Sequence, residues 1–231
     1  MIANVHDLGL IAYEPAWKLQ RELLEQRADN RIGDQFLLCE HTPVITMGKS
    51  GKQNNLLVSA EELRRRGVDY FVVERGGDLT YHGPGQLVGY PIFKLARLRE
   101  VQAFVRKMEE SVIRALAQFG VVGERRTDHP GVFIGGAKVA SIGAAVRRGV
   151  TYHGFALDVC TDLSYYRLIN PCGMPEVAVT TIAREAGRDV SVAEVKPLIR
   201  SAFEDVFGLH LEDAAEPALL AGPEVAIAKG A

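Results

Sequence analysis

Residues 75–89, with the sequence Arg-Gly-Gly-Asp-Leu-Thr-Tyr-His-Gly-Pro-Gly-Gln-Leu-Val-Gly, constrain the fold of this chain more than any other segment. Five of these fifteen residues are glycine, which is too many for a helix or an ordinary strand. We therefore expect a backbone that turns tightly between strands and that gathers polar side chains such as Arg75, Asp78 and His82. Two interpretations are open: a glycine-rich hairpin with its polar residues in solvent, or a loop whose backbone lies close to a ligand.

The composition of the 231-residue chain is that of a globular protein, with 47% hydrophobic and 24% charged residues. A net charge of −2 argues against nucleic acid as the main partner, because binding to phosphates favours a basic surplus. No apolar run has the length of a membrane span, and the N-terminus lacks the pattern of a signal peptide. Three cysteines without CxxC spacing predict reduced thiols in the cytoplasm, with neither a disulfide framework nor a metal site.

No repeat and no shift in composition divides residues 1–212, so the sequence predicts a single domain there, followed by a tail over 213–231 that is rich in Ala, Pro and Gly. Helices are expected over 13–27, 59–66, 101–119 and 191–208. Ser59 and Ser191 each precede a glutamate by three residues, which is the pattern of a capping box at a helix N-terminus. Short apolar runs bounded by turn residues predict strands at 35–39, 43–47, 70–73, 131–134, 138–146 and 152–159.

Three sequences that resemble known nucleotide or hydrolase motifs do not fit them. Gly48-Lys49-Ser50 has Pro43 where a P-loop needs its first glycine, and proline has no N–H to offer a phosphate. The glycines of segment 83–89 lack the spacing of a dinucleotide fingerprint and lead into a strand-like Tyr-Pro-Ile instead of a helix. Segment 139–143 lacks the first glycine of a GxSxG elbow, so a serine hydrolase is not expected.

The cysteines and one lysine are candidates for chemistry. Cys39 and Cys160 follow apolar residues and are expected to be buried. Cys172 lies in the turn sequence Asn-Pro-Cys-Gly, so it is either incidental or a nucleophile. Lys138 follows two glycines and an alanine and precedes an apolar run. It is either a charge at the edge of a strand or a partly desolvated amine that takes part in a reaction.

Together these segments resemble a known family, the octanoyltransferases of lipoate biosynthesis, of the lipoate-protein ligase B type. Five segments carry the resemblance and follow the order of the family. They are 40–44 (Glu-His-Thr-Pro-Val), 75–86, 136–143 (Gly-Ala-Lys-Val-Ala-Ser-Ile-Gly), 153–157 (His-Gly-Phe-Ala-Leu) and 170–173 (Asn-Pro-Cys-Gly). The resemblance covers nearly all of the chain from the first helix to the last and leaves out the tail.

The resemblance implies a fold and a reaction. The implied fold is α/β, a mixed sheet with flanking helices like the catalytic domain of biotin and lipoate ligases. The implied reaction moves an octanoyl group from octanoyl-acyl carrier protein to a lysine of a lipoyl domain in the cytoplasm, without a cofactor or a metal. The implied acceptors are the lipoyl domains of 2-oxoacid dehydrogenase complexes and the glycine-cleavage H protein, with no nucleic acid or membrane as partner.

Site residues follow from the same resemblance. Cys172 is the implied acyl-accepting thiol, and Lys138 is its implied activating amine. The acyl pocket is implied to be lined by Arg75, Gly76, Gly77, Asp78, Leu79, Thr80, Tyr81, His82, Ser141, Ile142, Gly143, Gly154, Phe155 and Ala156. These roles fit the chemistry, because a thiol exchanges with a thioester at little cost in energy and an amine beside it can promote thiolate formation or accept the proton.

Alternatives stay open at this point. His82 or His153 would pair with Cys172 if the site were a cysteine–histidine dyad, whereas the resemblance places both histidines in the pocket wall. An ATP-dependent lipoate or biotin ligase would use the same fold. A protein without catalysis would only bind acyl carrier or lipoyl domains, and a cysteine hydrolase would pass the acyl group to water. Basic clusters at Lys49 with Lys52 and at 64–66, 125–126 and 147–148 are either solvated surface or face acidic partners.

Overall fold

The computed structural model describes residues 1–97, 100–127, 129–170 and 177–214. The large sheet contains β1 (Ile2–Ile11), β2 (Asp34–His41), β6 (Gln86–Ile92), β7 (Glu124–Arg125), β8 (Gly131–Ile134), β9 (Ala137–Arg147), β10 (Val150–Asp158) and β11 (His210–Asp213). The small sheet contains β3 (Val44–Met47), β4 (Asp69–Val72) and β5 (Leu79–His82). The helices are α1 (Tyr13–Ala28), α2 (Ala60–Arg65), α3 (Val101–Ala117), α4 (Ile182–Ala186) and α5 (Val192–Phe207), with 3₁₀ helices at Gln53–Asn55 and Leu163–Leu168.

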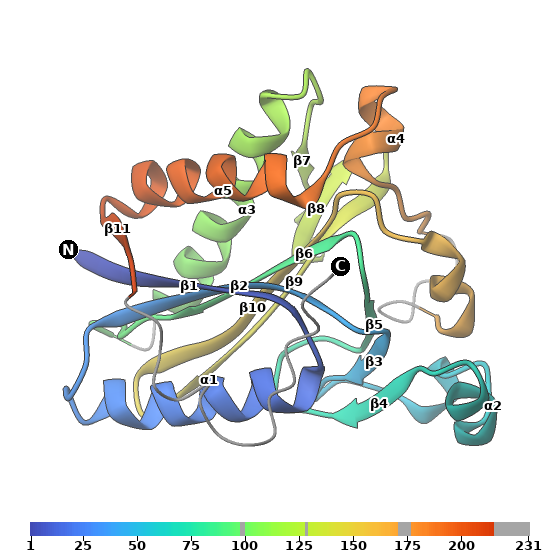
Figure 1. Cartoon of the computed structure of the whole chain (residues 1–231), viewed down its shortest axis with the longest axis horizontal. Helices are drawn as coiled ribbons and strands as arrows, with labels where there is room; N and C mark the ends of the chain where they lie inside the picture. The colour runs from blue at the N-terminus through green and yellow to red at the C-terminus, as the bar shows by residue number, and fades with distance from the viewer. Residues whose placement is uncertain (98–99, 128, 171–176, 215–231) are drawn as a thin grey trace, which may run out of the picture.

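The layers are those of a mixed α/β fold. Within the described residues the large sheet has the strand order β11-β1-β2-β6-β10-β9-β8-β7, and the small sheet has the order β4-β3-β5. Helices α3 and α5 cover one face of the large sheet and α1 covers the other, with the small sheet beside the start of α1 (Figure 1). The fold class implied by the resemblance is therefore confirmed. No helix in the described part of the chain is long and apolar enough to cross a membrane.

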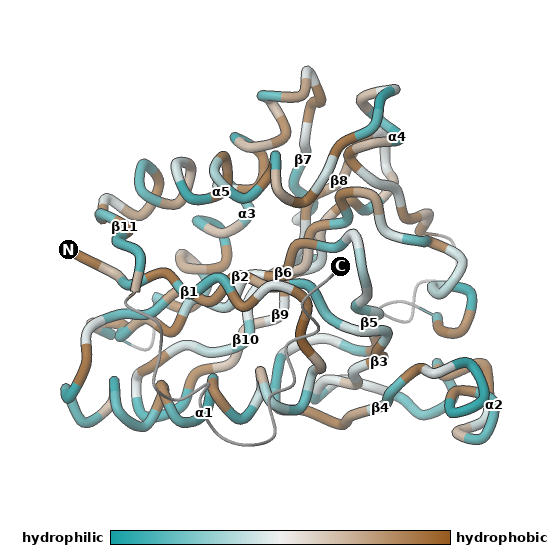
Figure 2. Tube along the Cα trace, in the orientation of Figure 1, coloured by the Kyte–Doolittle hydropathy of each residue, from teal (hydrophilic) through white to brown (hydrophobic). Residues whose placement is uncertain are grey.

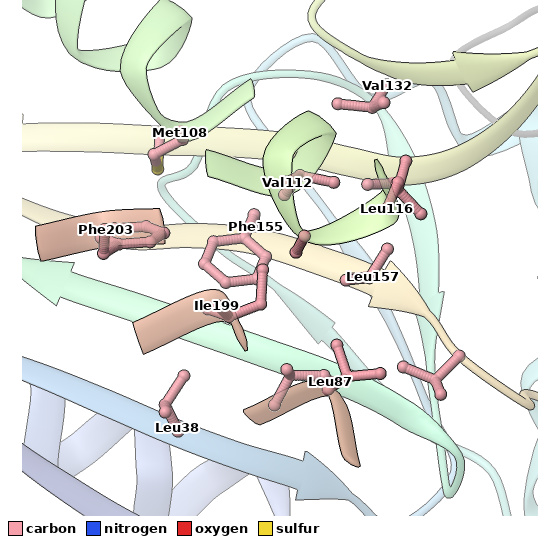
Figure 3. Packing of buried hydrophobic residues seen from close by; sticks show 14 of the residues in the cluster. Leu38, Leu87, Met108, Val112, Leu116, Val132, Phe155, Leu157, Ile199 and Phe203 are labelled. Atoms are coloured by element: carbon pink, nitrogen blue, oxygen red, sulfur yellow. The ribbon is translucent and has the colours of Figure 1, made fainter. Parts of the chain in front are cut away.

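Hydrophobic cores on both faces of the large sheet hold the layers together. On one face, residues of the sheet pack against residues of α3 and α5, among them Phe155, Met108 and Phe203 (Figure 3). On the other face, Leu19 and Leu23 of α1 belong to the core that covers β2, β6 and β10. The helices accordingly alternate between hydrophobic and hydrophilic residues along their length (Figure 2).

Capping residues mark where helices begin and end, at the positions that the sequence predicts. Ser191 accepts a hydrogen bond from the backbone N–H of Glu194, and the Glu194 side chain accepts one in return, so the capping box of α5 is complete. Ser59 caps α2 in the same way through its side chain. Gly208 follows α5 with a φ of 66°, a left-handed conformation that costs glycine little. The predictions of the helices α1, α2, α3 and α5 are confirmed within a few residues.

Strands β1, β5, β7 and β11, the larger part of β6 and the short helix α4 were not predicted. β1 lies parallel between β11 and β2, and its pairing with β2 shifts register between Asp7 and Leu10. This irregularity, with Gly9 at a φ of 59°, interrupts the apolar alternation by which a strand is recognised. β11 is four residues long and ends at Asp213, one residue beyond the predicted domain boundary. Residues 215–231 of the predicted tail lie outside the described residues, so that boundary stays a prediction.

The glycine-rich segment is not a hairpin with polar residues in solvent. Its two strands belong to different sheets, because β5 pairs with β3 and β6 pairs with β2 and β10. The side chains of Arg75, Asp78 and His82 are buried. Gly89 lies inside the fully buried strand β6, where a Cβ atom would lie 2.2 Å from Cε1 of Phe155. Position 89 has no room for a side chain, because the ring of Phe155 occupies the space that a Cβ atom would need.

One prediction about the thiols is wrong. Cys39 is buried in β2, as expected, but Cys160 is exposed. Cys160 follows the end of β10, and its backbone N–H donates to the carbonyl of Gly85, 2.9 Å away, at a bend of the chain. The sequence predicted a strand over 152–159, whereas β10 ends at Asp158, too early to bury the side chain of Cys160.

Candidate active site

A cavity of about 570 Å³ lies between the glycine-rich segment and strands β9 and β10. All of the site residues that the resemblance implied and that the structure describes contribute to its wall, with the exception of Tyr81. They are Arg75, Gly76, Gly77, Asp78, Leu79, Thr80, His82, Lys138, Ser141, Ile142, Gly143, Gly154, Phe155 and Ala156. Segments that are far apart in the sequence are therefore brought together around one space.

Tyr81 faces away from the cavity. Side chains alternate between the two faces of a strand, so Tyr81 points to the opposite side of β5 from Thr80 and His82. Its ring stacks on Tyr165 at a centroid distance of 4.7 Å and packs against Tyr166. The expectation that Tyr81 lines the pocket is therefore wrong.

Two glycines in register let the glycine-rich segment approach the sheet at the cavity wall. Gly143 in β9 pairs with Gly154 in β10, so the sheet lacks side chains at this point. The glycine-rich segment uses the space, and the N–H of Gly76 donates to the carbonyl of Ala144 over 3.2 Å. A Cβ atom on Gly143 would lie 2.9 Å from the carbonyl oxygen of Gly76. This close approach of two backbones explains why glycine is needed here.

Arg75 is held by the small sheet. Its Nη2 donates to the carbonyl of Thr46 over 2.6 Å and to the Thr46 hydroxyl over 2.9 Å, and Nη1 donates to the carbonyl of Gly76 over 3.0 Å. These contacts hold the guanidinium group in one orientation at the cavity wall.

Asp78 connects the glycine-rich segment to the turn that follows β3. Its carboxylate accepts hydrogen bonds from the backbone N–H of Lys52, at 3.1 Å, and from the side chain of Asn55. In the same turn, the N–H groups of residues 48, 49 and 50 donate to the carbonyls of residues 78, 75 and 77. A P-loop would use such N–H groups to bind phosphate, but here they donate to backbone carbonyls. The structure therefore agrees with the rejection of that motif.

Lys138 is buried at the cavity, with 5% of its surface exposed. It is therefore not a solvated charge at the edge of a strand. Its backbone pairs with the chain that returns after residue 176, because its N–H donates to the carbonyl of Ala178 and its carbonyl accepts from Thr180. The side chain passes Gly131, where a Cβ atom would lie 3.0 Å from Cε of Lys138. Nζ lies 5.4 Å from the ring centroid of Phe133.

A buried hydrogen-bond network supports His82 from behind. Gln86 donates through Nε2 to Asp158 over 2.9 Å, so its Oε1 accepts from Nδ1 of His82 over 2.8 Å. This arrangement assigns the ring hydrogen of His82 to Nδ1. Burial, together with the nearby His41, holds the pKa of His82 well below its usual value, so the ring is neutral at pH 7. Burial also raises the pKa of Asp158 to about 7, although Gln86 and Tyr166 donate hydrogen bonds to it.

Aromatic residues close the cavity on the side of α1. Tyr90 lies at the wall and donates its hydroxyl hydrogen to Nε2 of His41 over 2.7 Å. Nδ1 of His41 donates to the carbonyl of Ile11, and burial lowers the pKa of His41 to about 4, so the ring is a neutral acceptor for Tyr90. Tyr13, the first residue of α1, stacks on His82 at a centroid distance of 6.1 Å.

Cys172 lies outside the described residues, but the chain on either side of it contacts the cavity wall. The N–H of Asn170 donates to the carbonyl of Asn55 over 2.7 Å, and Asn55 lines the cavity. On the other side, Ala178 accepts from the N–H of Lys138.

Several wall residues had no signal in the sequence. Tyr13 and Val105 are indistinguishable by periodicity from residues that only pack a helix on a sheet. The other wall residues that were not predicted are Ser50, Lys52, Asn55, Val88, Tyr90, His129, Pro130 and Ala144. Of these, Lys52 and Asn55 follow the Gly-Lys-Ser turn, whose polar residues could have pointed to them.

Most of the basic clusters are paired on the protein itself. Arg147 and Arg148 contact Glu25, and Arg148 also contacts Asp29. Arg125 contacts two glutamates of α3, and residues 65 and 66 contact Glu62. These clusters are therefore weaker candidates for a surface that attracts acidic proteins than the sequence indicated.

Comparisons with known proteins agree with this geometry. The lipoyl protein ligase A/B catalytic domain matches residues 12–204. An octanoyltransferase of Rubrobacter xylanophilus is 46% identical over 202 residues, which are 87% of this chain and 91% of that protein. A lipoate protein ligase of Thermoplasma acidophilum with bound lipoic acid has a TM-score of 0.74 at 17% identity over 95% of this chain and 91% of its own.

A biotin protein ligase of Aquifex aeolicus has a TM-score of 0.53 at 13% identity and covers 90% of this chain and 70% of its own. The two solved structures establish the fold, and the fold agrees with the lipoate- and biotin-ligase architecture expected from the sequence. The matched domain spans most of the chain and includes all of the described cavity wall. The chain therefore belongs to the lipoyl protein ligase A/B catalytic-domain family.

Proposed function

We propose that this protein transfers an octanoyl group from octanoyl-acyl carrier protein to a lysine of a lipoyl domain, through a thioester on Cys172. The observation that carries the proposal is that one cavity is lined by buried Lys138 together with Ile142, Phe155 and Ala156. The apolar and backbone surfaces of this cavity suit an acyl chain. The similarity to octanoyltransferases supports octanoyl as the group that is transferred. The match to the lipoyl protein ligase domain supports a lipoyl domain as the acceptor.

The first half-reaction forms the acyl-enzyme. The thiolate of Cys172 attacks the carbonyl carbon of the donor thioester, and a new carbon–sulfur bond forms. The carbon–sulfur bond to the carrier then breaks, and the carrier thiolate takes a proton. Lys138 holds the proton that Cys172 gives up and returns it to the departing sulfur.

The second half-reaction forms the amide. The amine of the acceptor lysine attacks the acyl carbonyl, loses a proton to Lys138 and displaces the sulfur of Cys172, which is protonated again. Burial of Lys138 keeps water away from this proton transfer and strengthens the electrostatic effect that we propose for it on the thiol of Cys172. The acceptors that we propose are the lipoyl domains named above, including the glycine-cleavage H protein.

Intact-protein mass after mixing with octanoyl-acyl carrier protein, without ATP, tests the function. We expect one octanoyl adduct that is removed by hydroxylamine, that is absent in Cys172→Ser and that persists in Cys160→Ser. Cys160 is the matched control because its thiol is exposed. An adduct that requires ATP would indicate a ligase, and an adduct on Cys160 or Cys39 would refute Cys172 as the nucleophile.

Variants of Lys138 test its role separately. Lys138→Arg keeps the positive charge but cannot accept a proton near pH 7, so alkylation of Cys172 should keep much of its pH profile while acyl transfer is lost. Lys138→Ala should move alkylation to higher pH and also abolish transfer. If His82→Ala or His153→Ala shifts the alkylation profile and Lys138→Ala does not, the base is a histidine and the assignment is wrong.

A further inference from the structure

The cavity opens to solvent at four residues of its wall. Ser50, Lys52, Gly77 and Pro130 are exposed, whereas the other described residues of the wall are buried or half-buried. We call these four residues the entrance. A substrate that enters the cavity from solvent meets the entrance first, so the chemistry of these side chains bears on which substrates enter.

The wall of the cavity carries more basic than acidic side chains. Besides histidines, its ionisable residues in the described part of the chain are Lys52, Arg75 and Lys138, which are basic, and Asp78, which is acidic. The carboxylate of Asp78 is buried and already accepts hydrogen bonds from the backbone N–H of Lys52 and the side chain of Asn55. Arg75 and Lys138 are buried as well, so Lys52 is the basic residue of the wall that solvent reaches.

The positive charge at the entrance is not neutralised by the protein. Among the residues that the structure describes, the side chain of Lys52 forms no ion pair or hydrogen bond, and neither do those of its neighbours Lys49 and Ser50. The basic clusters further from the cavity differ, because arginines such as Arg125 and Arg148 contact acidic side chains. The entrance therefore offers a hydroxyl and an ammonium group to a ligand, with a second ammonium close by in the sequence.

Backbone hydrogen bonds hold this turn against the glycine-rich segment. The N–H groups of residues 48, 49 and 50 donate to the carbonyls of residues 78, 75 and 77 over 3.0–3.1 Å. The N–H of Lys52 donates to the carboxylate of Asp78 over 3.1 Å. The backbone that carries Ser50 and Lys52 is thus fixed before a ligand arrives, which lowers the entropy lost on binding.

The groups that enter the cavity in the proposed reaction differ in charge. The octanoyl chain and its thioester are neutral, and the lysine of the acceptor is positive in water, so none of these is attracted by Lys52. Acyl carrier protein presents its acyl group on a phosphopantetheine arm, and the phosphodiester is the anionic group of that arm. Because Lys52 lines the cavity, its ligand is a group that enters the cavity with the acyl chain.

We propose that Lys52 and Ser50 bind the phosphodiester of the phosphopantetheine arm of the acyl donor, and that Lys49 adds to the attraction. The inference rests on the proposed acyl transfer and names the part of the donor that the entrance recognises. An ammonium group binds phosphate as a point charge, and a hydroxyl group donates a hydrogen bond to a phosphate oxygen. A donor without the phosphate should therefore acylate the enzyme more slowly.

Two small donors that differ only in the phosphate test this contact. S-octanoyl-4′-phosphopantetheine and S-octanoylpantetheine are mixed with the enzyme below saturation, and intact-protein mass gives the rate constant of acyl-enzyme formation for each. In the wild type the phosphorylated donor should react roughly tenfold faster. In Lys52→Gln this ratio should fall close to one, and in Lys52→Arg it should persist. Lys18→Gln, which removes an exposed lysine of α1 outside the cavity wall, is the matched control and should leave the ratio unchanged.

The other outcomes overturn the inference or separate it from the proposed function. If Lys52→Gln slows acylation by octanoyl-acyl carrier protein but keeps the ratio of the small donors, Lys52 contacts the carrier protein itself and the phosphate contact is refuted. Equal slowing of both small donors would refute it too, because the lysine would then act on the acyl group. If no donor acylates the wild type, the proposed function fails. Calorimetry with 4′-phosphopantetheine and pantetheine then decides the inference alone, because equal affinities in the wild type would refute it and a preference lost in Lys52→Gln would support it.

Discussion

The buried carboxyl group of Asp158 makes stability depend on pH in a direction opposite to that of most carboxylates. Asp158 is 1% exposed, and burial raises its pKa from 3.8 to about 7. Between these two values the folded protein holds the proton and the unfolded chain has released it. The folded state therefore binds more protons, so stability is fully present below pH 3.8 and is lost as the pH rises to about 7.

Asp158→Asn removes this dependence. Asparagine has the shape of protonated aspartate, and its carbonyl oxygen can accept from Gln86 while its amide faces the Tyr166 hydroxyl. At about 1.4 kcal/mol per pKa unit, wild type loses roughly 3 kcal/mol between pH 5 and pH 7 through this group, and the variant does not. The variant should thus gain roughly 3 kcal/mol of unfolding free energy relative to wild type on going from pH 5 to pH 8.

Urea denaturation of both proteins at several pH values from 5 to 8 measures this difference, because other groups titrate equally in the two and cancel. Asp162→Asn is the control. Hydrogen bonds from Ser164 lower the pKa of the Asp162 carboxyl, so it is ionised in the folded and unfolded chains throughout this range. Its difference from wild type should stay constant. A difference between Asp158→Asn and wild type that is the same at pH 5 and pH 8, or that changes in favour of wild type, would refute a raised pKa at Asp158.

Three further substitutions test the architecture around the cavity. Gly143→Ala places Cβ 2.9 Å from the carbonyl oxygen of Gly76 and should lower kcat/KM for acyl transfer by roughly one to two orders of magnitude, and unchanged kinetics would contradict the close approach. Ser191→Ala breaks the capping box of α5 and should lower the unfolding free energy in urea by about 1 kcal/mol with kcat/KM unaffected. Glu109→Ala leaves the buried N–H of Gly131 without its acceptor and should cost about 1–3 kcal/mol, seen as a lower Tm, and an unchanged Tm would argue against that role.

Local features of this fold were predictable because their causes lie within a few residues of each other. The capping box at Ser191, the apolar stripe of α3 and the glycine after α5 are set by spacings of three and four residues. The same holds for the density of glycine in segment 75–89, which predicted a backbone that turns tightly between strands. The motifs that carry the family resemblance are also contiguous, which is why most of the residues of the cavity wall are predictable from the sequence.

The sequence by itself thus determined helices α1, α2, α3 and α5, strands β2, β3, β4, β8, β9 and β10, and the family. Tertiary structure alone decided that β5 and β6 separate into two sheets, that Tyr81 turns away from the cavity, and that Cys160 is exposed. It also decided that Asp158 is buried. These properties depend on which distant strand or helix lies alongside, and strand pairing depends on contacts between residues tens of positions apart that no local pattern encodes.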